Sequence, residues 1–272
     1  MRVAAIQMAS GSIISGNLLE AEKLISEAVS DGAEMLVLPE NFGMIGVKQE
    51  DVIEFGEKPG EGPLQEFLAD QSKRHNIIIV GGTIPLKSDD DKRYRNTLPV
   101  YNGDGECIAQ YDKIHLFDVS LPDADESYKE SAVSQPGDKI VVVEVGGIKL
   151  GLATCYDLRF PELFRLLVDK GAEVIVLPAA FTAATGKAHW HVLLQARAIE
   201  NQCFVIASAQ GGYHVNGRET YGHSLIVDPW GNVLDEVNSG SGYAIANLDL
   251  QQQHNIRERF PVLSHRKFFV NE

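Results

Sequence analysis

A segment of twelve residues that occurs twice constrains the fold of this chain more than any other feature. The two copies read DGAEMLVLPENF at 31–42 and KGAEVIVLPAAF at 170–181, and they lie 139 residues apart. Each copy ends a helical pattern on Gly, passes through an apolar run and leaves it at Leu-Pro. Unless this similarity is due to chance, the chain has two similar halves, each with a sheet, and the ends of corresponding strands meet. Ala179 holds the position of Glu40 in the second copy, so the acid is present in one copy only.

The patterns that flank the two copies repeat as well, because each half has a strand-like run, a helical pattern and a second strand-like run. These patterns lie at 3–8, 18–29 and 35–38 in the first half and at 148–154, 161–169 and 174–177 in the second. The β-α-β order predicts an α/β fold with parallel strands covered by helices. Further strands are expected at 77–83, 95–101, 106–111, 204–209, 222–228, 233–237 and 243–247, and further helices at 188–201 and 250–258. The only segment that resembles a linker is an exposed loop at 87–95, so we expect one domain over 1–272.

Charge and composition narrow the class of protein. Among 272 residues, 24 Lys and Arg stand against 38 Asp and Glu, and the net charge of −14 argues against a nucleic-acid partner. Three cysteines without a CxxC or CxxH pair favour a reducing compartment over disulfides or structural zinc. The apolar runs fall short of the roughly 18 to 20 residues of a membrane helix. Charged residues at 17–30 are unlike a signal peptide, so we expect a cytoplasmic protein without a membrane partner.

Several common site motifs are absent from the sequence. It contains no complete Rossmann fingerprint, no P-loop and no GxSxG elbow, and no motif requires a metal or an organic cofactor. His189 and His191 lie in the expected helix at 188–201, and residues two apart on a helix do not share a face. We therefore interpret them as one inward and one outward side chain, not as a metal site.

Cys155 is the strongest candidate for a catalytic residue. It follows the apolar run at 148–154 and precedes Pro161, which suits the first turn of a helix. A thiol at a strand-to-helix turn lies near free backbone N–H groups that can bind an oxyanion, and a helix start lowers the pKa of a thiol. A buried, inert thiol is the alternative, and we assign that state to Cys107 and Cys203.

A thiol that attacks an amide carbon needs a proton acceptor and a positive charge near the oxyanion. The repeat places Glu40 at a strand end, where burial would raise the pKa of its carboxyl group and suit it as a base. An exposed loop acid is the alternative. Lys113 is flanked by apolar residues that could draw it inward, although an ordinary solvated lysine is the default expectation from the sequence alone.

Three motifs, in this order, resemble the signatures of the nitrilase superfamily of carbon-nitrogen hydrolases. They are LPENF with Glu40, YDKIHLFD with Lys113 and LATCYDLRFPELFR with Cys155, and the likeness covers nearly the whole chain. The resemblance implies a four-layer α-β-β-α sandwich with two similar halves, a Glu-Lys-Cys triad and no cofactor. It also implies a homodimer or a higher homo-oligomer.

Within that superfamily the chain is similar to the Nit branch of amidases. The letters YKES at 128–131 resemble the element that carries a further glutamate, which assigns that role to Glu130; Glu126, just upstream, is the alternative. Segments that begin at Gly186 and Tyr221 look more like the deaminated glutathione amidase group than the omega-amidase group.

The resemblance implies a thiol amidase that converts deaminated glutathione to 2-oxoglutarate and Cys-Gly, a reaction of metabolite repair. An omega-amidase that acts on 2-oxoglutaramate or another dicarboxylate monoamide is one alternative. A non-catalytic scaffold or binding protein with the same fold is the other.

The mechanism that the resemblance implies is covalent. Glu40 takes the proton of Cys155, the thiolate attacks the amide carbonyl, and Glu40 later passes the proton to the leaving amine. Lys113 and the backbone N–H of Tyr156 stabilise the oxyanion, and Glu130 positions Lys113 or the substrate.

A substrate with carboxylates needs a local cation in a protein of this negative charge. Arg159 is our candidate for pairing with a substrate carboxylate, and a salt bridge to Glu162 or across a dimer is its alternative role. Phe181, Thr182 and Thr185 follow the second copy of the repeat, and we expect them to line the pocket.

Overall fold

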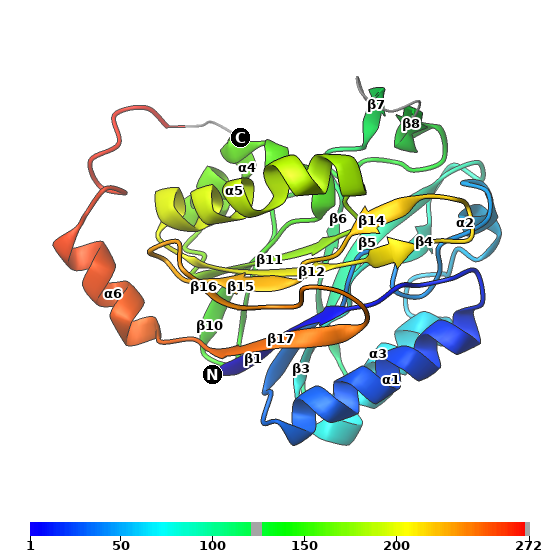
Figure 1. Ribbon diagram of the computed structural model, residues 1–272, viewed down its shortest axis with the longest axis horizontal. Helices are drawn as coiled ribbons and strands as arrows, with labels where there is room; N and C mark the ends of the chain where they lie inside the picture. Colours follow the sequence, from blue (N-terminus) through cyan, green and yellow to red (C-terminus); the bar gives the residue numbers. More distant parts are fainter. Residues whose placement is uncertain (121–126, 270–272) are drawn as a thin grey trace.

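In the computed structural model, which describes residues 1–120 and 127–269, two sheets face each other between two layers of helices (Figure 1). The first sheet has the strand order β17 (Gly242–Asn247), β1 (Arg2–Gln7), β2 (Met35–Val37), β3 (Ile78–Val80), β5 (Tyr94–Tyr101) and β4 (Ile84–Lys87), with β6 (Cys107–Asp112) also paired to β5. The second has the order β16 (Val233–Glu236), β15 (Leu225–Val227), β12 (Phe204–Ala209), β11 (Val174–Ala179), β10 (Ile148–Leu152) and β9 (Val142–Val145).

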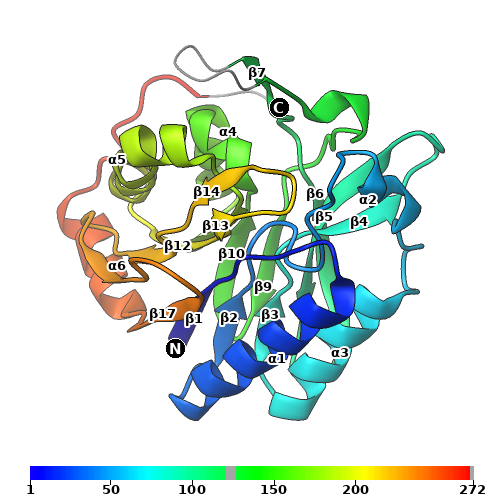
Figure 2. The same cartoon turned by 45° about the vertical axis from the view of Figure 1, so that its right-hand side comes forward.

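The helices cover the outer faces of both sheets. The helices α1 (Ile14–Ser30) and α3 (Pro63–His75) lie side by side on the first sheet, and α4 (Pro161–Asp169) and α5 (Ala183–Asn201) lie on the second (Figures 1 and 2). The remaining elements are α2 (Asp51–Glu54), α6 (Leu250–Arg259), the 3-10 turns η1 (Glu130–Ala132) and η2 (Cys155–Arg159), and the short hairpins β7 (Asp118–Ser120) with β8 (Ser127–Lys129) and β13 (Gly211–Tyr213) with β14 (Glu219–Tyr221).

The alternation of side chains along each strand builds three apolar cores. In β11, Val174 and Val176 point into the core between the sheets, whereas Ile175 and Leu177 join the core beneath α4 and α5. The strand β2 divides its side chains in the same way between the central core and the core beneath α1 and α3. Because successive side chains on a strand face opposite sides, strands buried on both faces are apolar throughout. The α-β-β-α sandwich expected from the sequence is confirmed.

The two halves have the same order of elements around their parallel strands. Apart from the short α2 and the 3-10 turn η2, the first runs β1-α1-β2-α3-β3 and the second runs β10-α4-β11-α5-β12, with parallel pairing between successive strands in each. The strands of the sequence repeat, β2 and β11, are the central strands of the two sets. The similarity of the two halves is therefore present in the topology.

Most predicted elements are found, and the differences have local causes. The strand expected at 222–228 is shortened to β15, because Gly222 and His223 have φ values of 70° and 56°, which an extended strand does not allow. The helix α3 was missed because its apolar stripe is narrow, although Pro63 at its start and basic residues in its last turn are helix signals.

The side chain of Cys107 is exposed, so the prediction of a buried thiol at this position is wrong. Cys107 begins β6, which is paired with β5 at the edge of the first sheet, and most side chains of β6 face solvent. Cys203 is buried as predicted.

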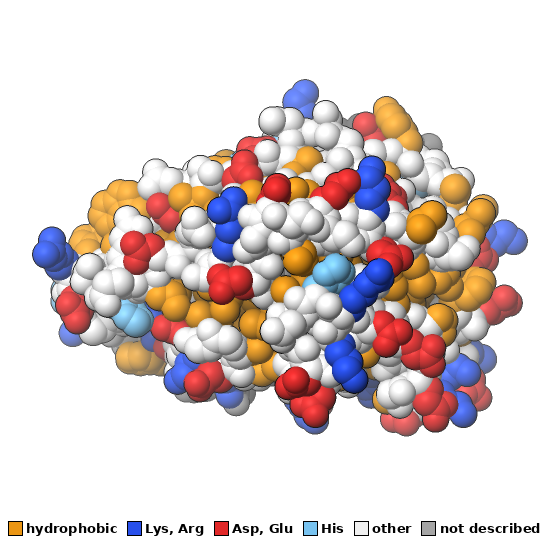
Figure 3. Space-filling view, turned by 90° about the horizontal axis from the view of Figure 1, so that it is seen from below, with side chains coloured by type: hydrophobic (Ala, Val, Ile, Leu, Met, Phe, Trp, Pro, Cys, Tyr) orange, Lys and Arg blue, Asp and Glu red, His pale blue; other side chains and the backbone are white. Residues whose placement is uncertain are grey.

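Surface charge is mixed on the face drawn in Figure 3. On that side of the molecule, which is seen from below in the view of Figure 1, Lys and Arg side chains are scattered among Asp and Glu. This arrangement does not form a basic patch on that face. Among residues 1–120 and 127–269, every helix is too short or too polar to cross a bilayer.

Gly82 offers a test of how tightly the end of the first sheet is packed. Its φ is 58°, and a Cβ added there would lie 2.1 Å from the carbonyl oxygen of Pro39, the residue before Glu40. We expect Gly82→Ala to lower the free energy of unfolding by about 3 kcal/mol or more, from backbone strain and displacement of this peptide. Chemical denaturation measures the loss.

Gly60→Ala is the matched control, since Gly60 has a φ of 83° but open space around the added Cβ. This variant should show only the left-handed backbone penalty of about 1 kcal/mol. Equal losses for the two variants would contradict the packing argument.

Candidate active site

Three segments that are far apart in the sequence bring Glu40, Lys113 and Cys155 together. Glu40 lies just beyond β2, Lys113 follows β6 directly, and Cys155 begins η2 after β10. The exposed fractions of these residues are 3%, 2% and 6%, so all three are withdrawn from bulk water. The alternatives of an exposed loop acid and a solvated lysine are therefore excluded.

Lys113 is held between two carboxylates. Its Nζ atom lies 2.9 Å from Oε1 of Glu40 and 3.0 Å and 2.8 Å from the two oxygens of Glu130. Burial alone would lower the pKa of Lys113, but the charges of Glu130 and Glu40 outweigh it and hold the pKa well above its usual value. Lys113 is therefore a permanent cation in this site.

Glu40 is ionised in the same arrangement. Its Oε1 atom accepts hydrogen bonds from Lys113 and, at 3.0 Å, from Nδ2 of Asn96. Burial acts to raise the pKa of Glu40, but the Lys113 charge and hydrogen bonds from Cys155 and Lys113 together leave it below the usual value. The sequence-based expectation of a raised pKa is wrong, because it considered burial without the contact to Lys113.

Cys155, in contrast to Glu40, is held in its neutral form. Burial and then the neighbouring Glu40 carboxylate raise the pKa of the Cys155 thiol far above its usual value, despite the opposing charge of Lys113. The expectation that the turn would lower this pKa is wrong for that reason. The site at rest thus holds a neutral thiol, a carboxylate that accepts a hydrogen bond from it, and an ammonium group.

The turn that presents Cys155 is locked by Asp157. Cys155 has a φ of 47°, and the turn begins with a capping box between Thr154 and Asp157. The carboxylate of Asp157 accepts hydrogen bonds from the backbone N–H of Thr154 at 2.8 Å and from the Tyr111 hydroxyl at 2.6 Å, and it contacts Nδ1 of His115 at 2.7 Å. Sequence analysis missed Asp157, although its spacing of three residues from Thr154 was a capping signal.

Glu130 and Asn96 complete the polar surroundings of Lys113. Besides its contacts with Lys113, Glu130 accepts a hydrogen bond from the backbone N–H of Phe117 at 2.7 Å. Glu126, the alternative to Glu130, lies outside the described residues. Asn96 was not among the predicted site residues; an Asn within the expected strand at 95–101 was the available signal, because this residue type is uncommon in strands.

A cavity of about 430 Å³ opens onto these groups. It is lined by all nine predicted site residues, namely Glu40, Lys113, Glu130, Cys155, Tyr156, Arg159, Phe181, Thr182 and Thr185. Lys48 and Arg218 also line it, and sequence analysis did not single them out. The cavity therefore combines a protected thiol with several cationic side chains.

The cations of the cavity wall are held in place by neighbouring groups. The Arg159 guanidinium lies 5.2 Å from the ring centroid of Phe181, and its Nη1 atom is 3.2 Å from Nδ1 of His189. No ion pair joins Arg159 to Glu162 in the part of the chain that the structure describes, which removes one of its alternative roles. Arg218 lies over the Tyr128 ring and donates a hydrogen bond to the carbonyl of Ala180.

Comparison with known proteins places this chain in a family. The sequence pattern of the family described as carbon-nitrogen hydrolase matches residues 2–258. The chain is 44% identical over 269 residues to the deaminated glutathione amidase of a Synechocystis species, covering 97% of each chain. It is 36% identical to omega-amidase NIT2-B of Xenopus laevis, covering 98% of this chain and 95% of the relative.

A solved structure shows the same fold. Nit3 of Saccharomyces cerevisiae, described as a member of branch 10 of the nitrilase superfamily, aligns with a TM-score of 0.88 and 31% identity. The alignment covers 98% of this chain and 97% of Nit3.

The charge of Glu40 should control the reactivity of Cys155. Glu40→Gln removes the negative charge beside the thiol while Lys113 remains, so the pKa of Cys155 should fall. We expect the pH profile of Cys155 alkylation by iodoacetamide, followed by mass spectrometry of the labelled peptide, to move to lower pH. Cys107 on β6 is the internal control, and its profile should stay unchanged. A Cys155 profile that stays in place or moves to higher pH would contradict the coupling.

Proposed function

The chain belongs to the carbon-nitrogen hydrolase family and is a thiol amidase, and we propose that it hydrolyses deaminated glutathione to 2-oxoglutarate and Cys-Gly with Glu40, Lys113 and Cys155 as catalytic residues. The observation that carries this proposal is the buried contact of a carboxylate with a thiol and an ammonium group at the wall of a cationic cavity. The group of relatives named deaminated glutathione amidase supports the choice of substrate.

In the first step, the sulfur of Cys155 attacks the amide carbon while Glu40 accepts the thiol proton. The lowered pKa of Glu40 keeps it ionised and able to accept, and the raised pKa of Cys155 keeps the proton on sulfur until substrate binds. A neutral resting thiol is therefore compatible with catalysis, because its base is already in hydrogen-bond contact. This arrangement also argues against the non-catalytic scaffold.

The oxyanion that forms needs groups that donate hydrogen bonds to it. The ammonium group of Lys113 supplies one, and the backbone N–H of Tyr156, in the turn that follows Cys155, supplies the other. Glu130 acts as a positioning residue, since both of its oxygens contact Nζ of Lys113. The carbon-nitrogen bond then breaks, and Glu40 passes its proton to the leaving amine.

The second half of the reaction releases the acid product. Glu40, again ionised, takes a proton from a water molecule that attacks the thioester carbon. The carbon-sulfur bond breaks, the acid leaves, and the proton returns to the sulfur of Cys155. No redox partner or cofactor enters this balance.

The charges of the cavity wall favour a substrate with carboxylates at both ends. The protein has a net charge of −14, so binding of an anion depends on local cations. Besides Lys113, the cavity wall carries Lys48, Arg159 and Arg218. Deaminated glutathione has two carboxylates to pair with these side chains, whereas 2-oxoglutaramate has one.

An omega-amidase is the second candidate function, and the similarity to the Xenopus laevis enzyme supports it. The same catalytic groups would serve both substrates, so the two functions differ only in what the cavity binds. The homodimer, the cytoplasmic location and the single domain over 1–272 that the sequence suggests remain predictions.

Removal of the buried cation tests the catalytic arrangement. We expect Lys113→Ala to lower kcat by at least about 100 to 1000-fold, the typical cost of losing one oxyanion donor. Steady-state hydrolysis measures this, with Lys92→Ala in the exposed loop between β4 and β5 as the control. A thermal melt of each variant establishes whether the protein is folded, and near-normal activity of a folded Lys113→Ala protein would remove this residue from catalysis.

A side-by-side assay with deaminated glutathione and 2-oxoglutaramate tests the substrate, with Cys155→Ser as the blank. We expect a higher kcat/KM for deaminated glutathione, and we expect Arg159→Ala to raise KM with a smaller effect on kcat because it removes a binding group. A preference for 2-oxoglutaramate would replace the proposed substrate with the second candidate. Absence of hydrolysis of both substrates would overturn both candidate functions.

A further inference from the structure

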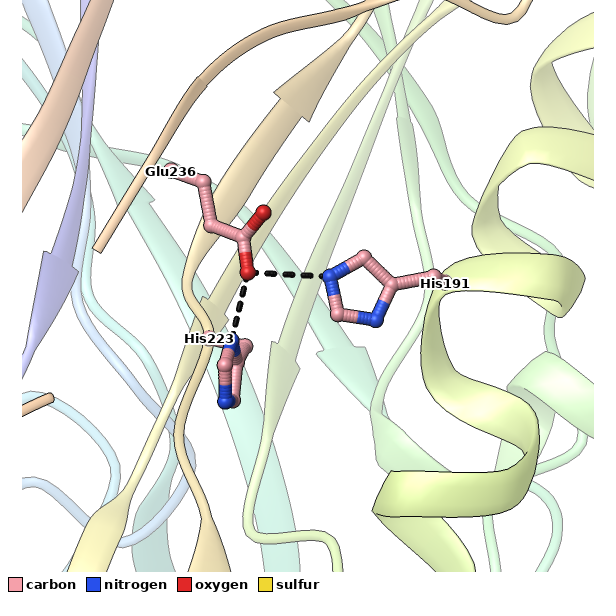
Figure 4. A group of neighbouring side chains, drawn as sticks. All are labelled: His191, His223 and Glu236. Atoms are coloured by element: carbon pink, nitrogen blue, oxygen red, sulfur yellow. Dashed lines mark hydrogen bonds and ion pairs between the residues drawn. The ribbon is translucent and has the colours of Figure 1, made fainter. Parts of the chain in front are cut away.

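Three side chains outside the cavity converge on one point. His191 projects from α5, His223 lies between β14 and β15, and Glu236 ends β16 (Figure 4). Oε1 of Glu236 is 2.9 Å from Nε2 of His191 and 2.5 Å from Nδ1 of His223. Two imidazole nitrogens and a carboxylate oxygen therefore lie within 4.8 Å of one another.

The sequence could not indicate this group, because its members are far apart in the chain. The spacing argument on His189 and His191 is consistent with the structure, since His189 contacts Arg159 and His191 contacts Glu236. The partners of His191 come instead from the segment after β14 and from β16.

The surroundings of His223 hold its backbone and its ring in place. The backbone carbonyl of His223 accepts a hydrogen bond from Nε1 of Trp190 at 2.8 Å, which ties its segment to α5. The Tyr221 ring stacks on the His223 ring with centroids 4.2 Å apart. His223 is held at a φ of 56°, a conformation that costs energy for a residue with a side chain. The group is therefore a built arrangement of side chains from three elements.

Two imidazoles and one carboxylate match the ligand preference of zinc. Zinc binds His nitrogen at about 2.0 to 2.1 Å and carboxylate oxygen at about 2.0 to 2.2 Å, often with a water as the fourth ligand. The side chains of His191, His223 and Glu236 are 31%, 25% and 23% exposed, which leaves access for an ion and a water molecule. Small side-chain movements would open the hydrogen-bonded contacts to the spacing of ligands around one ion.

We propose that His191, His223 and Glu236 bind one divalent transition-metal ion of the zinc type, at a site separate from the catalytic cavity. On binding, each imidazole coordinates the ion through the nitrogen that now faces Glu236, and a proton carried on that nitrogen leaves it for the other ring nitrogen or for solvent. The ion replaces two hydrogen bonds with three coordinate bonds. It would join α5, whose first turn includes the cavity residue Thr185, to the second sheet at β16.

The competing explanation is a carboxylate that only bridges two imidazoles by hydrogen bonds. The test uses tag-free Cys155→Ser protein, because a thiol in the cavity could bind the added ion and obscure the result. Calorimetric titration with Zn²⁺ should give one bound equivalent, and Co²⁺ should give the visible absorption of a four-coordinate site. Since Cys155→Ser is inactive under the proposed function, these readouts do not depend on the identity of the substrate.

Variants in the Cys155→Ser background locate the site. Glu236→Gln keeps the shape and a hydrogen-bond acceptor but loses the charge, and His223→Asn suits the left-handed backbone better than Ala would. We expect each to weaken Zn²⁺ binding at least tenfold. The control is His254→Ala, which removes an imidazole from a surface pair with Glu173, 3.1 Å apart, and should leave binding unchanged.

Each outcome is decisive for the proposal. Absence of Zn²⁺ binding to Cys155→Ser protein would support the hydrogen-bonded bridge alone and overturn the metal site. Equal binding by Glu236→Gln, His223→Asn and the parent protein would place the ion elsewhere and also overturn it. A thermal melt in Zn²⁺ provides a second readout, because an ion that binds the folded state should raise the Tm of the parent protein and not that of folded Glu236→Gln protein.

Discussion

The buried ammonium group of Lys113, held between the carboxylates of Glu40 and Glu130, is the interaction on which the site depends. Transfer of each charge from water costs several kcal/mol, and only close opposite charges and further hydrogen bonds offset that cost. The backbone N–H of Phe117 and the side chain of Asn96 supply such bonds. Burial and then the adjacent Glu40 carboxylate raise the pKa of the Cys155 thiol and keep it protonated, despite the opposing charge of Lys113. Protonation states are therefore properties of the whole cluster.

The fold assembles this cluster by placing the reactive side chains just beyond the ends of strands. Glu40, Lys113 and Cys155 follow β2, β6 and β10, so strands of the two sheets fix the origin of each side chain. The turn at Cys155 requires a left-handed backbone, which a residue with a side chain adopts at a cost. Asp157 stabilises that turn through its contacts with Thr154 and Tyr111. A buried acid that does not line the cavity thus links the strand β6 to the position of the thiol.

Sequence reasoning predicted the architecture because the repeat and the apolar periodicity are local signals. It also selected residues that prove to line one cavity, Lys113 among them, although nothing in the sequence showed that Lys113 was buried. The directions of the pKa shifts of Glu40 and Cys155 were wrong, since each depends on a charge from another segment. The group around Glu236 was beyond prediction for the same reason. Apolar patterns along the chain indicate which helices and strands form, whereas the pKa of a buried group depends on charges that other segments place beside it.

The two copies of the repeat explain why a symmetric scaffold carries an asymmetric site. Glu40 of the first copy faces Lys113, whereas Ala179, its counterpart, packs into the apolar core beneath α5. An acid at Ala179 would be buried among apolar side chains without a cation, at a cost of several kcal/mol. The second copy contributes through its backbone instead. The N–H of Ala180 faces the sulfur of Cys155 and its carbonyl accepts a hydrogen bond from Arg218, so one strand end supplies the base and the other supplies oriented peptide groups.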